Sequence, residues 1–110
     1  MRYYIIDEIS ATHMEKIESY LKDNAIGSEM EKVFWVELPN DILTETQYSH
    51  RDCKPHVFAI ELVGNAIKLE LFTRSLKGLS CECQSYSSQQ QREFIFNYVE
   101  NMIDNLAIRT

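Results

Sequence analysis

The chain has 110 residues, of which 45% are hydrophobic and 25% charged, a composition typical of a globular domain that buries its own core. Its formal net charge of -6 argues against a nucleic-acid-binding protein, because phosphate binding normally needs a basic surplus. No apolar run is long enough for a signal peptide or a membrane span, and an odd count of three cysteines makes no disulfide framework. We therefore expect a single cytoplasmic domain over residues 1–110 without membrane contact.

The first half of the chain predicts a strand, a helix and a second strand. Residues 2–6, RYYII, form a short run of β-forming side chains. Over residues 12–25 the apolar side chains recur at helical spacing, which predicts a helix. Residues 32–38, KVFWVEL, are rich in branched and aromatic side chains and predict the second strand. Residues 41–50 fit either a short helix or a loop, and the pattern does not decide between them.

The second half predicts an antiparallel meander followed by a helix. Apolar and polar side chains alternate in residues 57–63, 66–73 and 79–86, and Gly64-Asn65 suits a two-residue turn between the first two segments. Residues 87–108 carry one wide apolar stripe at helical spacing. The order β-α-β-(α)-β-β-β-α predicts an α+β domain, with helices packed on one face of an antiparallel sheet of about four or five strands.

Five histidines and cysteines, side chains of the kind that bind transition metals, fall in two short stretches. His50, Cys53 and His56 lie in one short stretch, HRDCKPH, and Cys81 and Cys83 flank a glutamate in CEC. A tetrahedral zinc ion takes four nitrogen or sulfur ligands. The three cysteines with either His50 or His56 would supply them, and the sequence does not choose between the two histidines.

The competing interpretation makes Cys81 and Cys83 core residues, with no cofactor. If the third strand of the meander pairs across a short turn, Cys81 lies opposite Leu71 and Cys83 opposite Leu69. Both thiols would then face the helices, where free cysteine commonly packs as a small apolar side chain.

Four basic residues are expected at the same end of the sheet as these histidines and cysteines: Arg51, Lys54, Arg74 and Lys77. Together they predict a site for an anion or for an acidic partner. The alternative is a set of solvated turn residues, because turns are normally polar. An enzyme acting at this end, with Cys53 as a nucleophile or with an anionic substrate, is a further hypothesis.

Recognised catalytic patterns are missing from the sequence, which has no glycine-rich phosphate loop, no G-x-S-x-G and no H-E-x-x-H. The element order is similar to that of small α+β interaction domains such as the longin and roadblock types and secretion chaperones, a likeness that transfers no residues. We therefore expect a non-enzymatic interaction or regulatory domain, with a zinc-binding domain as the alternative. A homodimer or other protein partner would cover an apolar outer sheet face formed by Val57, Val63, Ala66, Phe72 and Tyr86.

Overall fold

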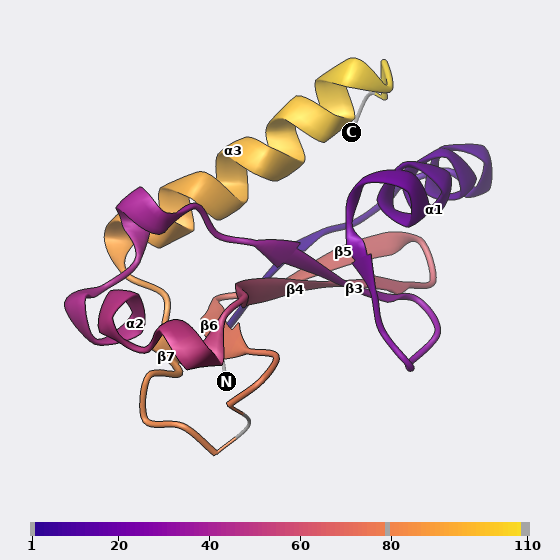
Figure 1. Ribbon diagram of the computed structural model, residues 1–110. Helices are drawn as coiled ribbons and strands as arrows, with labels where there is room; N and C mark the ends of the chain where they lie inside the picture. The colour runs from indigo at the N-terminus through magenta and orange to yellow at the C-terminus, as the bar shows by residue number, and fades with distance from the viewer. Residues whose placement is uncertain (1, 79, 109–110) are drawn as a thin grey trace.

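The computed structural model describes residues 2–78 and 80–108 and has the expected α+β architecture, with helices covering one face of an antiparallel sheet (Figure 1). The elements in chain order are β1 (Tyr3–Ile6), α1 (Ala11–Asn24), β2 (Ile26–Gly27), β3 (Val33–Glu37), the 3-10 turn η1 (Asn40–Ile42), α2 (Glu45–Ser49), the 3-10 turn η2 (Arg51–Cys53), β4 (His56–Val63), β5 (Ala66–Glu70), β6 (Phe72–Ser75), β7 (Ser85–Tyr86) and α3 (Gln89–Asn105). The predicted fold class is thus confirmed.

The main sheet has the strand order β1-β5-β4-β3-β2, and β6 and β7 extend it beside the start of β4. The first predicted hairpin is confirmed, because Val63 lies opposite Ala66 and Ile60 opposite Leu69. Gly64 occupies its turn with a φ of 57°, in the left-handed region that glycine adopts without strain. This hairpin forms the centre of the sheet.

The third predicted strand, residues 79–86, is wrong over most of its length. Only Ser85–Tyr86 pairs with β6, residues 80–84 form turns, and Leu79 lies outside the described residues. The predicted register is wrong for a physical reason: the chain leaves β5 after Glu70, and β6 then pairs with the beginning of β4. A long connection therefore follows β6, and Cys81 and Cys83 lie in it rather than opposite Leu71 and Leu69.

The hydrophobic core lies between the sheet and the helices α1 and α3. Its fully buried members are Ile17 and Leu21 of α1, Phe58 and Ile60 of β4, Ile67 and Leu69 of β5, and Ile95 and Met102 of α3. Apolar side chains of this kind each contribute about 1.5–3 kcal/mol on burial, so this layer supplies most of the driving force for folding. Within the described residues, no helix combines the length and the apolar character that crossing a membrane requires.

The apolar outer face expected from the sequence is only partly exposed. Val57 is completely buried, at a point where β4 has β3 on one side and β6 on the other. Val63 and Tyr86 remain 49% and 47% exposed, but they lie on different strands at separate places in the sheet. The exposed apolar side chains therefore do not form the single patch that the alternation predicted.

Candidate metal centre

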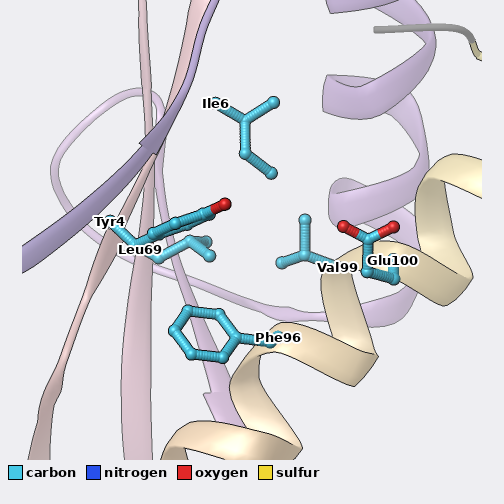
Figure 2. Close-up of a pocket in the computed structure, with 6 residues that line it drawn as sticks. All are labelled: Tyr4, Ile6, Leu69, Phe96, Val99 and Glu100. Carbon is cyan, nitrogen blue, oxygen red and sulfur yellow. The ribbon is translucent and has the colours of Figure 1, made fainter.

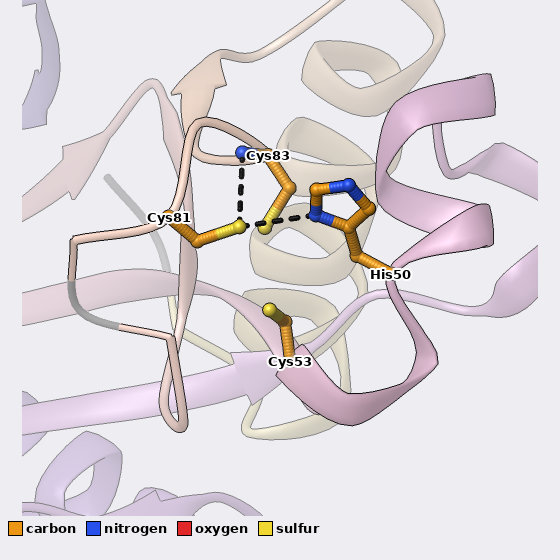
Figure 3. Close-up of side chains that lie close together, drawn as sticks. All are labelled: His50, Cys53, Cys81 and Cys83. Atoms are coloured by element: carbon orange, nitrogen blue, oxygen red, sulfur yellow. Dashed lines mark hydrogen bonds between the residues drawn. The ribbon is translucent and has the colours of Figure 1, made fainter.

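Four of the five candidate metal ligands point toward one another beside α2 (Figure 3). The nitrogen of His50 and the sulfurs of Cys53, Cys81 and Cys83 all lie within 4.8 Å of one another, and His50 Nδ1 is 3.0 Å from Cys81 Sγ. In a tetrahedral zinc site with these ligands, neighbouring ligand atoms are about 3.5–3.8 Å apart, as follows from bond lengths of about 2.0–2.3 Å. Small side-chain rotations would therefore convert the observed cluster into that geometry.

Two chain segments supply these four residues. His50 caps the C-terminal end of α2, and the N–H of Cys53 donates to the His50 carbonyl at 3.1 Å across the turn η2. In the second segment the N–H of Cys81 donates to the Gly78 carbonyl at 2.9 Å, and the N–H of Gln84 donates to the Cys81 carbonyl at 3.3 Å. The short spacings His-x2-Cys and Cys-x-Cys thus become two adjacent hairpin-like turns, each presenting two ligand atoms.

Ser75, at the end of β6, fastens both segments to the sheet. Its buried hydroxyl donates to the carbonyl oxygen of Cys53 and accepts the N–H of Gly78 at 2.7 Å. Its own N–H donates to the side-chain oxygen of Gln84 at 2.9 Å. Because one residue contacts both turns, their relative position is set by the sheet and not by the cysteines alone.

Gly78 allows the two turns to approach each other. A Cβ at this position would lie 2.7 Å from Cys53 Sγ and 3.0 Å from Cys81 Cβ, closer than real side chains pack. Sequence reasoning treated Gly78 as an ordinary turn residue and missed this role. The only signal in the sequence was a glycine three residues before the CEC motif.

Two buried glutamines hold α2, and therefore His50, against the rest of the fold. Gln91 Nε2 donates to Gln47 Oε1 at 2.8 Å, and Gln91 Oε1 accepts from Thr73 Oγ1 at 3.1 Å. Both glutamines are completely buried, and each also completes a capping box, Gln47 with Thr44 and Gln91 with Ser88. The sequence analysis missed both, although the spacing T-x-x-Q and S-x-x-Q was a usable signal.

The electrostatics of the cluster differ sharply between two of its cysteines. The pKa of Cys81 is lowered to about 7, chiefly because the N–H of Cys83 donates to its sulfur, with help from the neighbouring thiol and imidazole. The pKa of Cys83 is raised to about 12, chiefly by burial and then by the adjacent thiols. A bound divalent cation would override this difference, since its charge favours the thiolate form of every coordinating cysteine.

His56 lies beside the four-residue cluster. Its side chain is 1% exposed, and its Nε2 is 3.4 Å from Cys83 Sγ, while Nδ1 is buried without a hydrogen-bond partner. Burial lowers the pKa of His56, which favours the neutral imidazole. The structure therefore places His50 within the cluster and His56 against one of its sulfurs.

The predicted basic residues have different surroundings. Arg74 makes a bidentate ion pair with Glu70 at 2.6 and 2.9 Å, so its charge is already balanced. Arg51 and Lys77 are exposed, and Lys54 is partly buried. A site for an anion formed by these residues stays a prediction, with Arg74 its least available member.

No protein-family model matches this sequence, and searches of curated proteins and of solved structures likewise give no match. The chemistry of the cluster is therefore inferred from the residues of this chain.

Proposed function

We propose that this protein is a small zinc-binding domain in which His50, Cys53, Cys81 and Cys83 hold one structural Zn²⁺. The observation that carries the proposal is the convergence of three sulfurs and one imidazole nitrogen within 4.8 Å. Zinc accepts this mixture of soft thiolate and borderline imidazole ligands in closed tetrahedral sites. Harder cations such as Mg²⁺ and Ca²⁺ prefer oxygen ligands, so they fit this set poorly.

The ligand number favours a structural over a catalytic role for the metal. Four protein ligands complete a tetrahedron, and a catalytic zinc needs a position left open for water or substrate. The bound ion would join the end of α2 to the connection between β6 and β7. Among the described residues, that connection is held to the sheet by the hydrogen bonds of Ser75, and the metal would add a second cross-link to it.

The core between the sheet and the helices does not include the four cluster residues. We therefore expect the metal-free domain to keep its core and its Ser75 contacts, with the connection before β7 less stable than in the zinc-bound protein, unlike a zinc finger, which unfolds completely. The interaction role predicted from the sequence remains compatible with this proposal, because a structural metal site orders a surface without specifying its partner.

Cobalt substitution tests the proposal directly. Titration of the reduced, metal-free protein with Co²⁺ should give visible absorption bands typical of tetrahedral coordination, together with thiolate-to-cobalt charge transfer, saturating at one equivalent. Zinc should then displace the cobalt. The absence of these bands at any cobalt concentration would reject the metal site.

Histidine variants test which imidazole is the ligand. His50→Ala should weaken cobalt binding by more than the roughly 10–100-fold typical of losing an outer-shell partner. His13→Ala is the matched control, because His13 lies on α1 and outside the cluster, and it should bind cobalt like the unmodified protein. If His56→Ala abolished binding while His50→Ala did not, the proposed ligand set would be wrong.

A further inference from the structure

β1 is an edge strand, and its exposed side chains are unusual for an edge strand. It pairs with β5 alone among the described strands, and Tyr3, Tyr4 and Ile5 are 44%, 47% and 56% exposed. Edge strands normally avoid sheet-to-sheet association through charged side chains, prolines, bulges or covering elements. The four residues Tyr3–Ile6 contain no charge and no proline, and their pairing with β5 is regular. β1 is therefore an unprotected edge.

The hydrogen bonds to β5 define which backbone groups of β1 are free. The N–H of Leu71 donates to the carbonyl of Arg2 at 2.9 Å, so Arg2 belongs to the set that faces β5. Because this set alternates along an antiparallel strand, the backbone groups of Tyr3 and Ile5 point toward the open edge. A second antiparallel strand can pair with β1 only in a register that places Tyr3 and Ile5 opposite residues whose own backbone N–H and C=O groups point toward β1.

A small, mostly apolar groove lies on the helix side of this edge, between β1 and α3 (Figure 2). It is a cavity of about 110 Å³ lined by Tyr4, Ile6, Leu69, Phe96, Val99 and Glu100. The rings of Tyr4 and Phe96 meet edge to face, with their centroids 4.9 Å apart. An added strand would place its own apolar side chains on this face beside the groove, as neighbouring strands of a sheet do.

We propose that β1 is the contact strand of a symmetric dimer of this chain, paired antiparallel with β1 of a second copy and with Ile5 on the two-fold axis. In this register Tyr4 of each copy lies opposite Ile6 of the other on the helix side. Arg2 of each copy comes toward Asp7 and Glu8 of the other, which follow the end of the strand. The alternative register with Tyr4 on the axis would set Arg2 opposite Ile6 and lose this charge pairing.

The charge distribution of the segment favours a second copy as the occupant. Arg2 precedes the strand, whereas Asp7 and Glu8 follow it, and all three residues are exposed. An antiparallel copy brings the basic end of one strand to the acidic end of the other, twice over, as two-fold symmetry requires. Parallel addition of the same strand would instead bring like charges together.

The contact is short, so we expect a weak dimer with a Kd in the micromolar range, as is typical of interfaces below about 1,200 Å². The four cluster residues lie outside β1, so this proposal does not depend on the metal.

Sedimentation equilibrium over about 1–500 μM, a range that brackets such an affinity, tests the proposal. The mass should rise with concentration from 12.9 kDa toward twice that value. Ile5→Lys places a charge on the edge and should raise the Kd at least about tenfold. Ile26→Lys is the matched control, since Ile26 is 39% exposed on β2 at the opposite edge, and its dimerisation should be unchanged. Circular dichroism and unfolding midpoints establish that both variants are folded.

A charge exchange tests the register. Arg2→Glu should weaken the dimer, and adding Glu8→Arg in the same chain should restore it. A constant mass of one chain throughout the range would overturn the proposal, as would a dimer that Ile5→Lys leaves intact or that Ile26→Lys disrupts equally. A dimer insensitive to both charge variants would overturn the Ile5-centred register.

Discussion

Replacing Gln91 by leucine tests whether buried amides hold α2, and with it His50, in place. The substitution nearly preserves side-chain volume, so the main loss is of hydrogen bonds rather than of packing. Gln91 donates to Gln47 at 2.8 Å and to the Ile42 carbonyl at 3.0 Å, and it accepts from Thr73 at 3.1 Å and from the N–H of Ser88 at 3.0 Å. Three of these bonds connect α3 with η1, α2 and β6, and the fourth closes the N-terminal cap of α3.

The expected loss follows from the net value of each bond, about 0.5–1.5 kcal/mol, and from the penalty for buried groups left without a partner. Thr73 keeps its hydrogen bond with Ser87, and the Gln47 side chain keeps those with Thr44 and Ser85, which limits that penalty. We therefore expect the free energy of unfolding to fall by about 3 kcal/mol. Urea denaturation followed by circular dichroism measures this change, with metal-free protein used for every variant.

Gln90→Leu is the matched control, because it makes the same substitution at an exposed position of the same helix. Its effect should stay within about 0.5 kcal/mol, as for most surface substitutions. A loss below about 1 kcal/mol for Gln91→Leu, or one equal to that of the control, would refute the reasoning that this buried network positions α2.

Three further outcomes are expected. Gly78→Ala should weaken cobalt binding, because the added Cβ would lie 2.7 Å from Cys53 Sγ. Gly27→Ala is the control and should not weaken it, since the added Cβ there meets nothing within 4 Å. Equal cobalt affinities of the two variants would contradict the close approach at Gly78. Leu69→Ala should lower the free energy of unfolding by about 2–5 kcal/mol in thermal or urea denaturation, since Leu69 is fully buried, and a smaller loss would show that the site is not tightly packed. In metal-free, reduced protein, the alkylation rate of Cys81 should rise with pH and level off above its lowered pKa of about 7, because the thiolate predominates above that pKa. Cys83, whose pKa is raised to about 12, should stay unreactive at neutral pH. Peptide mass spectrometry after iodoacetamide treatment distinguishes the two cysteines, and equal labelling would contradict their different surroundings.

The parts of the fold that were predictable from sequence are those in which local pattern and tertiary environment agree. The hairpin of β4 and β5 has a glycine turn flanked by strict alternation, and its register was predicted correctly from Val63 and Ala66. Helix α3 carries an apolar stripe over several turns, and its side chains share one face only at the helical period. β2 was missed, because a two-residue strand such as Ile26–Gly27 is too short to show any period.

The residues around the cluster show why the rest could not be predicted. The alternation that suggested a strand through Cys81 and Cys83 comes from two thiols that face His50 and Cys53, and a period of two does not distinguish this from a core-facing strand. The choice between His50 and His56 depends on α2 being followed by His50 as its C-cap and by the turn η2, which brings Cys53 close to His50. The sequence left that segment ambiguous between helix and loop.

The measurement that tests the metal site most directly is the metal content of the protein, purified without an affinity metal column and under reducing conditions. Native mass spectrometry and elemental analysis should find one zinc per chain, and thiol reagents at neutral pH should label Cys81 readily only after a chelator removes the zinc. Protein that carries no zinc when grown with ample metal, and whose thiols react identically with and without the chelator, would contradict the account.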